Sequence, residues 1–375
     1  MPRSAPPMKP LAGIRVVELA RILAGPWCGQ LLADLGAEVV KVERPGAGDD
    51  TRHWGPPFVT APDGGNRDAA YFHATNRGKA SVAIDIATAG GQDRVRALVA
   101  DADVVIENYK VGGLARYGLD HGALSVVRPG LITCSITGFG QTGPYAHRAG
   151  YDFIIQAMGG AMSLTGEPGG PPQKAGVAYA DLFTGVYSAV AILAALRRRD
   201  LTGEGAHIDM ALLDTQVAVL GNQALNWLAG DTVPTRMGNG HANLAPYQAF
   251  ETADGALVIA VGNDGQFARL CAVLGLALHR DARFATNPAR VVHRRELIPA
   301  VQAAVAGWRK ADLYEALEAA GIPAGPINAL DEVFADPQVV ARGMAIRPDG
   351  LPGLAGPIVI DGERMVAERG APERP

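Results

Sequence analysis

Two aspartates in apolar surroundings near the middle of the chain are the first candidates for chemistry. Asp152 precedes an apolar segment, and Asp181 lies in YADLFTG, just before the largely apolar run 185–196. An aspartate at the start of a helix can cap it, because its side-chain oxygens accept hydrogen bonds from backbone N–H groups that lack intrahelical partners. The alternative is a catalytic carboxylate that the helix N-terminus keeps ionised and available as a nucleophile. Both readings of Asp181 stay open on residue types alone.

Composition narrows the class of protein. The 375 residues are 48% hydrophobic and 19% charged, which is typical of a folded protein, and the length suggests two domains. A net charge of −4 without a polybasic stripe argues against a nucleic-acid partner. Cys28, Cys134 and Cys271 lie far apart and show neither a disulfide framework nor metal-ligand spacing. We therefore expect no metal site and a reducing compartment, the cytoplasm.

Membrane segments are not expected. The N-terminal segment MPRSAPPMKP lacks the apolar core of a signal peptide. The apolar run 185–196 is too short to span a bilayer, and three arginines close it.

The first half of the chain alternates between strand and helix patterns. Apolar segments rich in β-branched residues predict strands at 14–19, 37–43, 81–86, 104–106 and 131–136. The segments between them predict helices at 27–35, with a glycine cap at Gly36, at 91–100 and around 113–117. Apolar strands that alternate with helices predict an α/β fold with a parallel sheet covered on both faces. The turn after the first strand, ARILAGPW, lacks the GxGxxG spacing, so a standard dinucleotide site is not supported.

The second half predicts a smaller α+β unit. Its pattern predicts a strand at 206–210, one long helix at 211–228, a hairpin turn at Asp254-Gly255, a strand at 256–261, and helices at 266–274, 294–306 and 311–320. We place a large domain at 1–215, a small α+β domain with its linkers at 216–325, and a return to the large domain at 326–375.

Several stretches in a fixed order carry a family resemblance. They are PLAGIRVVELARILAGPWCGQLLADLGAEVVKVERPGAGDDTR, NRGKASVAID, ADVVIENYKVGGLARYGLD, SITGFGQTGPYAHRAGYDFIIQAMGGAMSLTG, YADLFTG and GNGHANLAPYQAF. Together they resemble the class III CoA-transferase family, which includes formyl-CoA transferases, carnitine CoA-transferases and α-methylacyl-CoA racemases. The resemblance implies a Rossmann-like parallel-sheet large domain plus a smaller α+β domain. It also implies an interlocked homodimer whose active site lies between the large and small domains of different subunits.

The resemblance also assigns site residues. Asp181 matches the nucleophilic aspartate of the family, and Asp152 matches an acidic residue beside it. The positions that match CoA contacts are Ala24, Arg44, Asn108, Tyr109 and Arg116. The segment that matches the glycine-rich cover loop begins with Gly238, Asn239, Gly240 and His241.

Other readings of these positions remain open. Arg44 and Arg116 could be solvated surface residues, Asn108 a helix cap, and Asp152 a structural residue. His241 is more simply read as a polar loop residue than as a base.

The implied activity is transfer of CoA from an acyl-CoA to a carboxylic acid through an aspartyl anhydride and an aspartyl-CoA thioester. Acyl-CoA and small carboxylic acids are then substrates, no cofactor is permanently bound, and the members most resembled use succinyl-CoA and other small dicarboxyl-CoA esters. Leu23 and a cover loop with only two glycines disfavour formate and oxalate, because formyl-CoA transferases carry Gln and GGGGQ at these positions.

Two other functions are weighed against this one. A racemase of the same family needs the histidine of a GHD motif, but this chain has Tyr151 there, and a phenol that titrates near pH 10 is a poor base at neutral pH. A non-catalytic CoA-binding or scaffold protein is disfavoured because Asp181 and its surrounding motif are retained.

Overall fold

The structure is a computed structural model that describes residues 8–60, 64 and 67–375. By their contacts these residues divide into two compact units. The first unit comprises the chain up to Ala161, Lys174–Gly221 and Asp336–Pro375, and the second comprises Met162–Gln173 and Asn222–Ala335. The chain therefore passes from the first unit to the second after Gly221 and returns after Ala335, somewhat beyond the boundaries we placed at 215 and 325. The sequence pattern did not indicate that 162–173 belongs with the second unit.

Six strands form the sheet of the first unit. They are β1 (Arg15–Glu18), β2 (Glu38–Glu43), β5 (Ala80–Ala83), β6 (Val104–Glu107), β7 (Ile132–Thr137) and β8 (Ala206–Ala211). The spatial order is β5-β2-β1-β6-β7-β8, and every neighbouring pair is parallel. The predicted parallel sheet is confirmed. This is the order of doubly wound sheets, which bind ligands beyond the carboxyl ends of the strands where the order reverses, here between β1 and β6.

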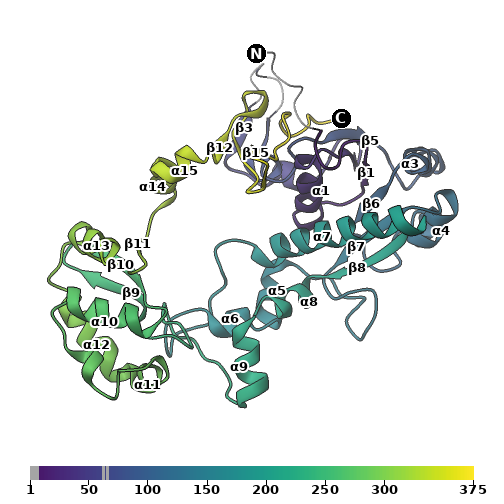
Figure 1. Ribbon diagram of the computed structural model, residues 1–375. Coiled ribbons are helices and arrows are strands. Elements are labelled where there is room, and N and C mark those ends of the chain that lie inside the picture. Colours follow the sequence, from purple (N-terminus) through teal and green to yellow (C-terminus); the bar gives the residue numbers. More distant parts are fainter. Residues whose placement is uncertain (1–7, 61–63, 65–66) are drawn as a thin grey trace. The chain divides into compact units, whose positions relative to one another are not determined.

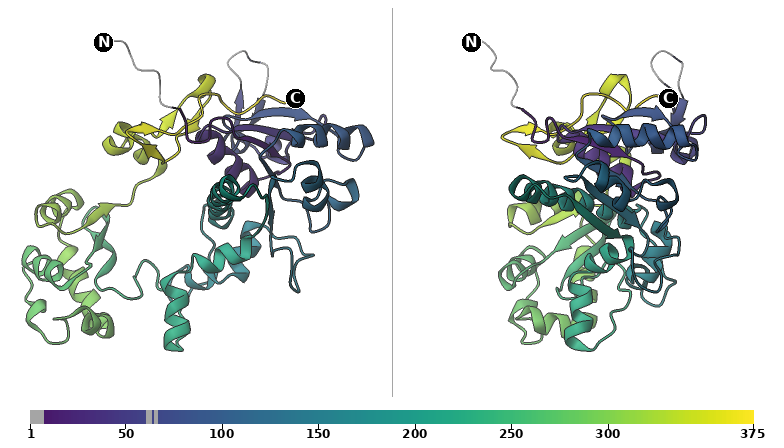
Figure 2. Two further views of the ribbon diagram at one scale, coloured as in Figure 1. Left: turned by 45° about the vertical axis from the view of Figure 1, so that its right-hand side comes forward. Right: turned by 90° about the vertical axis from the view of Figure 1, so that its right-hand side faces the viewer.

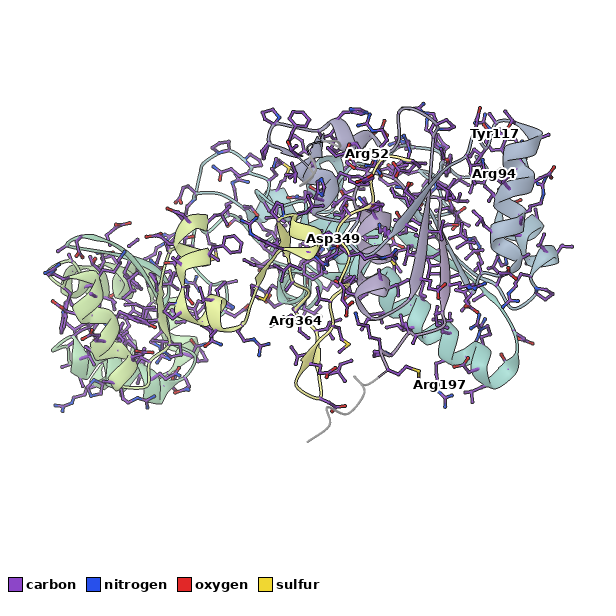
Figure 3. All side chains as sticks on the ribbon, turned by 90° about the horizontal axis from the view of Figure 1, so that it is seen from above. Arg52, Arg94, Tyr117, Arg197, Asp349 and Arg364 are labelled. Atoms are coloured by element: carbon purple, nitrogen blue, oxygen red, sulfur yellow. The ribbon has the colours of Figure 1, made fainter. Side chains whose placement is uncertain are left out.

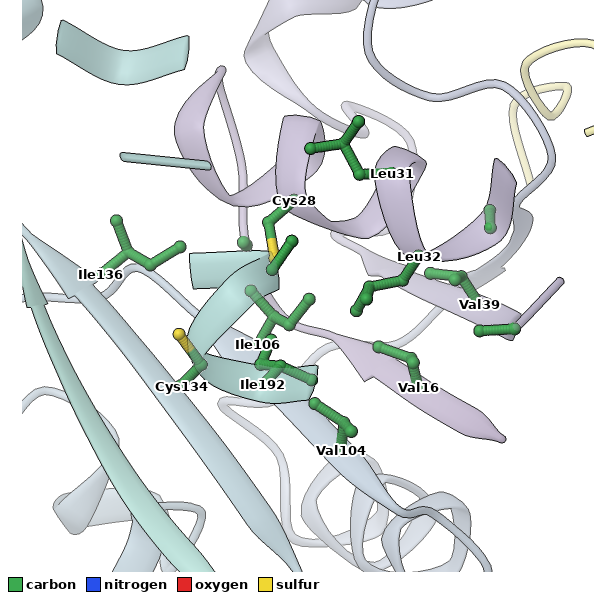
Figure 4. Packing of buried hydrophobic residues seen from close by; sticks show 14 of the residues in the cluster. Val16, Cys28, Leu31, Leu32, Val39, Val104, Ile106, Cys134, Ile136 and Ile192 are labelled. Carbon is green, nitrogen blue, oxygen red and sulfur yellow. The ribbon is translucent and has the colours of Figure 1, made fainter. Parts of the chain in front are cut away.

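Helices cover both faces of this sheet (Figure 1). They are α1 (Ala24–Asp34) and α7 (Tyr179–Thr202) on one face, and α3 (Ala89–Ala100) and α4 (His121–Val127) on the other. Alternate residues of each strand point to opposite faces, so Val16 packs with Cys28 and Ile192 under α1 and α7 (Figure 4). Val17 packs instead under α3.

The first helix ends as predicted. Gly36, at φ 105°, follows α1, and its N–H donates to the carbonyl of Ala33. A left-handed glycine after the last turn satisfies carbonyls that the helix leaves without partners. The glycine therefore fixes where the chain leaves α1 and enters β2.

The remaining elements of the first unit are short. They are η1 (Asp50–His53), β3 (Phe58–Thr60), β4 (Arg67–Ala69), α2 (Ala70–His73), η2 (Ala115–Tyr117), α5 (Asp152–Met158), α8 (Leu212–Ala218), α15 (Pro337–Ala341), β12 (Ala345–Ile346), η4 (Pro348–Gly350), β13 (Gly353–Leu354), β14 (Val359–Ile360) and β15 (Glu363–Arg364). The helix predicted around 113–117 is only the 3₁₀ turn η2. The helix α6 (Ala161–Leu164) begins where the chain passes to the second unit.

The second unit is the predicted α+β fold (Figure 2). Its antiparallel sheet, in the order β11-β10-β9, contains β9 (Tyr247–Thr252), β10 (Gly255–Ala260) and β11 (Ala324–Pro326). Its helices are α9 (Asn222–Gly230), α10 (Asp264–Val273), η3 (Leu278–Arg280), α11 (Asn287–Val292), α12 (Arg294–Val305), α13 (Lys310–Ala319) and α14 (Leu330–Ala335). The hairpin turn before β10 is confirmed, because Thr252 pairs with Gly255.

The long helix predicted at 211–228 is wrong. The chain forms α8 and α9 instead, separated at Gly221, which has a φ of 54°. A left-handed residue ends a right-handed helix, and the break coincides with the passage from the first unit to the second.

Helix α7 is longer than the apolar run suggested. It has 24 residues, and an 18-residue window within it reaches a mean hydropathy of 1.6, so by length and composition alone it could cross a membrane. However, Ala180, Ser188 and Ile192 are buried, and the helix packs on α1 and β7 in the core of the first unit. We therefore interpret α7 as the core helix of a globular unit.

Candidate active site

Asp181 lies in the first turn of α7, but it does not cap this helix. The N-cap position is Ala178, whose side chain makes no capping hydrogen bond. The cap comes from another helix, because Asp152 Oδ1 accepts a hydrogen bond of 3.0 Å from the N–H of Ala180. Asp152 Oδ2 accepts a second bond, of 2.7 Å, from Gln156 Nε2. Asp152 therefore stabilises the start of α7, and the Asp181 carboxylate has no hydrogen-bond partner among the described residues.

This environment changes the acidity of Asp181. Burial, followed by the negative charge of Asp152, raises the pKa of Asp181 to about 7. The expectation that the helix N-terminus keeps this carboxylate ionised is therefore wrong at neutral pH, where about half of the groups are protonated. Loss of hydration disfavours the charged form more than the helix dipole favours it.

A cavity of about 560 Å³ brings most of the predicted residues together. Its lining includes Ala24, Asn108, Tyr109, Arg116 and Asp181. Ala24 follows β1 and Asn108 follows β6, so the cavity lies at the carboxyl ends of these strands, where the strand order reverses. The structure therefore places these five predicted residues around one cavity.

Close packing of α1 on α7 places Ala24 and Asp181 in the same cavity. Gly185 makes this packing possible, because a Cβ atom there would lie 2.7 Å from the carbonyl oxygen of Ala24 and 2.9 Å from Trp27 Cδ1. The two helices can approach this closely only where α7 has no side chain.

Arg44 lies outside this cavity. It lines a neighbouring cavity of about 320 Å³, which shares Arg21 and Tyr109 with the first. Arg44 and Arg116 are both exposed, and neither pairs with a carboxylate in the described part of the chain. The guanidinium of Arg116 lies 4.6 Å from the ring centre of Tyr117. Both cations are available to an anionic ligand such as a phosphate.

Asn108 holds the backbone of the turn between β1 and α1. Its Oδ1 accepts from the N–H of Arg21 at 2.9 Å, and its Nδ2 donates to the Arg21 carbonyl at 2.6 Å. The alternative reading, a cap for the helix that follows, is wrong, because η2 begins only at Ala115 and has no side-chain cap. The amide of Asn108 is therefore engaged with the protein itself.

The segment that matches the cover loop belongs to the second unit. The N–H of Asn243 donates to His241 Nδ1 at 3.0 Å, and Arg294 donates to the carbonyls of His241 at 3.0 Å and Ala242 at 2.7 Å. Since Nδ1 accepts a hydrogen bond, the proton of the neutral imidazole lies on Nε2. His241 therefore presents a donor, which favours the polar-loop reading over a base.

Two residues near the predicted site had escaped the sequence analysis. Burial, together with the negative charges of Asp181 and Asp152, raises the pKa of Tyr71 to about 12, so this phenol of α2 lies within electrostatic reach of both carboxylates. Arg148 lines the large cavity and stacks on Tyr145 at 3.9 Å. No local sequence pattern distinguishes Tyr71. Arg148, in contrast, lies four residues before Asp152, and this spacing could have indicated it as a site residue.

The sequence and fold match known proteins along nearly the whole chain. The model of CoA-transferase family III matches residues 11–374. This chain belongs to that family. It is 57% identical to the succinate–glutarate CoA-transferase of Agrobacterium fabrum, over 100% of this chain and 94% of the relative. It is 47% identical to the succinyl-CoA:glutarate CoA-transferase of Mus musculus, over 90% of this chain and 77% of the relative.

A solved structure agrees with this assignment. The crystal structure of a CAIB/BAIF family protein from Brucella suis matches with a TM-score of 0.86 and 57% identity, and the match covers 97% of this chain and 96% of that one. The present protein is therefore a CoA-transferase. In this CoA-transferase, the Asp181 carboxylate accepts no hydrogen bond from the residues that the structure describes, and the cavity that it lines includes Arg116, which pairs with no carboxylate among them.

Proposed function

We propose that this enzyme transfers CoA from succinyl-CoA to a short dicarboxylic acid, with glutarate as the first candidate. The observation that carries the proposal is the position of Asp181, whose carboxylate lines the same cavity as Ala24 and Arg116 and has no hydrogen-bond partner among the described residues. The named activities of the relatives at 57% and 47% identity support the choice of acids.

The first half of the reaction places CoA on the enzyme. A carboxylate oxygen of Asp181 attacks the thioester carbonyl of succinyl-CoA, the C–S bond breaks, and a mixed anhydride and the CoA thiolate form. The thiolate then attacks the aspartyl carbonyl of the anhydride, which releases succinate and leaves CoA as a thioester on Asp181. Two easier steps replace one difficult exchange, and the energy of the thioester is retained.

The second half returns CoA to an acid. A carboxylate of glutarate attacks the aspartyl thioester, which releases the CoA thiolate and forms a second anhydride. The thiolate attacks the glutaryl carbonyl of this anhydride, so glutaryl-CoA leaves and the Asp181 carboxylate is restored. Both anhydrides hydrolyse if water reaches them, so the reaction requires a closed site, and we assign that closure to the loop that contains Gly238, Asn239, Gly240 and His241.

We also propose that the enzyme is an interlocked homodimer with a Rossmann-like first unit. The strand order of the first unit supports the Rossmann-like assignment. An exposed apolar stripe along α7 supports a dimer. It consists of Phe183, Val186, Tyr187, Val190 and Leu193. We place the protein in the cytoplasm, because its three cysteines are free and buried.

The proposal is tested by incubating purified enzyme with succinyl-CoA and a panel of short dicarboxylic, branched and aryl acids, and by following acyl-CoA products by chromatography. We expect glutaryl-CoA from the wild type. We expect none from Asp181→Ala, which should unfold at nearly the wild-type temperature. A wild type that transfers CoA to no acid of the panel would contradict the proposal. If the wild type instead introduces deuterium at the α-carbon of an acyl-CoA in deuterated water, the racemase function replaces the proposed transferase function.

A further inference from the structure

One residue of the cavity wall has a backbone conformation that its side chain disfavours. Among the described residues, four that are not glycine have φ in the left-handed region, namely Ile22, Asp231, Asp349 and Asp361. Aspartate tolerates this region, but a β-branched residue such as isoleucine does not. Ile22 has a φ of 74°, follows β1 and lines the cavity that contains Asp181. A strained residue at such a place requires surroundings that hold it.

Three side chains hold the turn that contains Ile22, each from a different segment. Both carboxylate oxygens of Asp49 lie 3.3 Å from the Ile22 nitrogen and accept its N–H. Asn108 binds the backbone of Arg21 through both atoms of its amide. Lys41 Nζ donates to the carbonyl of Ala20 at 2.7 Å. The backbone of residues 20–22 is therefore fixed from β2, from the loop after β2 and from the end of β6.

The support of Asp49 is buried and charged. Asp49 is 1% exposed and forms an ion pair of 2.9 Å with Lys41, which also binds Glu18 at 2.9 Å. Burial opposes the charge on Lys41, but Glu18 and Asp49 outweigh it and raise the pKa of Lys41 to about 12. Charges inside a protein are held firmly only when they are paired in this way. The network therefore fixes the place of the Asp49 carboxylate.

A second anchor holds the backbone of Asp49. Its N–H donates to Glu43 Oε2 at 2.7 Å, and the same carboxylate accepts 2.8 and 2.6 Å bonds from the guanidinium of Arg52. Arg52 is labelled in Figure 3. Arg52 is fully buried and also pairs with Asp68 at 2.5 Å. Both the backbone and the side chain of Asp49 are therefore fixed, so the carboxylate that accepts the Ile22 N–H has a defined position.

We propose that Asp49 is a positioning residue for acyl-CoA, because it keeps Ile22 in the left-handed conformation that shapes the wall of the Asp181 cavity. This inference rests on the proposed function, since it takes that cavity as the CoA site. A purely local role is the alternative, because Asp49 also accepts from the N–H and the hydroxyl of Thr51 at the start of η1.

A double-mutant cycle separates the two roles. Glycine adopts positive φ without strain, so the Ile22→Gly background does not need Asp49 to hold this conformation. We expect Asp49→Asn to raise KM for succinyl-CoA by about tenfold in the Ile22 background and by less than about twofold in the Ile22→Gly background, because contacting residues are coupled. KM for glutarate should change little. Dissociation constants for CoA, measured by calorimetry, should follow the same pattern.

Asp103→Asn is the matched control. Asp103 also accepts from a backbone N–H, that of Arg15 at 2.9 Å, and pairs with Arg199 at 2.8 Å. It lies just before β6, at the opposite end of the sheet from the cavity. Asp103→Asn should leave KM for succinyl-CoA unchanged in both backgrounds.

Each result decides the inference. An equal rise of KM in both backgrounds assigns Asp49 the local role and overturns the proposal, and so does an unchanged KM in the Asp49→Asn variant. If Asp49→Asn does not fold, Asn108→Ala tests the same turn, and the same dependence on Ile22 is expected. These outcomes are distinct from failure of the proposed function, in which the wild type makes no glutaryl-CoA or Asp181→Ala retains turnover.

Discussion

The nucleophilic role that we propose for Asp181 depends on a carboxylate that accepts no hydrogen bond among the described residues. Asp152 takes the N–H of Ala180, and Asp181 is left half-buried beside a second negative charge. A carboxylate that is poorly solvated and accepts no internal hydrogen bond is a stronger nucleophile than one that is well hydrated. At neutral pH about half of the enzyme molecules carry a protonated Asp181, and a protonated carboxyl group cannot attack a thioester.

The pH dependence of the reaction should show this directly. A group with its pKa near 7 is increasingly protonated as the pH falls, so we expect kcat/KM for succinyl-CoA to fall about tenfold per pH unit below pH 7. Asp152→Asn keeps an acceptor for the Ala180 N–H but removes the charge, so its profile should shift to lower pH. The exposed Asp93→Asn of α3 is the control and should leave the profile in place. An Asp152→Asn profile that coincides with that of the wild type contradicts this account.

The two arginines at the cavities should separate the substrates kinetically. We expect Arg116→Ala and Arg44→Ala to raise KM for succinyl-CoA by about ten- to a hundredfold, because a charge-assisted hydrogen bond to a phosphate contributes about 1.5–3 kcal/mol. KM for glutarate should change far less. Equal effects on the two substrates would show that these arginines support the fold rather than bind CoA.

Site residues could be predicted from the sequence where they lie within a motif of the family. Asp181, Ala24 and Arg116 belong to continuous matching stretches, and the structure brings them to one cavity. The capping of α7 by Asp152 was not predictable, because it joins two segments through a tertiary hydrogen bond. Tyr71 was not predicted for the same reason, because it lies near Asp181 only in the folded chain.

At the scale of elements, the contact of α1 with α7 determines where the site forms. Gly185→Ala would place a Cβ atom 2.7 Å from the Ala24 carbonyl, so the helices must move apart. We expect it to reduce the free energy of unfolding by about 1–3 kcal/mol and to raise KM for succinyl-CoA. Gly90→Ala is the control, since a Cβ atom there, near the start of α3, meets nothing within 4 Å. Denaturant unfolding of both variants measures the difference, and equal stabilities would contradict the packing argument.

Helices and strands could be predicted where the local sequence pattern favours the same structure as the packing of the folded chain. The apolar strands and the glycine after α1 gave the parallel sheet and the first crossover. The break at Gly221 was missed, because an apolar pattern continues across it and only the passage between units requires the chain to turn. The C-terminal hairpins were missed because two-residue strands are too short for any periodicity.

For the whole molecule, the exposed stripe of α7 is the main feature that a single chain leaves unexplained. We expect the wild type to have the mass of two chains by light scattering. Val190→Glu should weaken the dimer by about 3 kcal/mol or more, because an unpaired charge is costly inside an interface. Val126→Glu of α4, where the side chain is 81% exposed, is the control and should remain dimeric. A fully active wild-type monomer would contradict the dimer.

The central claim is that Asp181 becomes covalently bound to CoA, and trapping that adduct tests it most directly. Enzyme incubated with succinyl-CoA alone should carry an aspartyl-CoA thioester. Borohydride should reduce this thioester to an alcohol, and hydroxylamine should convert it to a hydroxamate. Peptide mass spectrometry should then locate either change at Asp181, within the tryptic peptide Ala175–Arg197. An active enzyme whose peptide stays unmodified under both reagents would contradict the covalent mechanism.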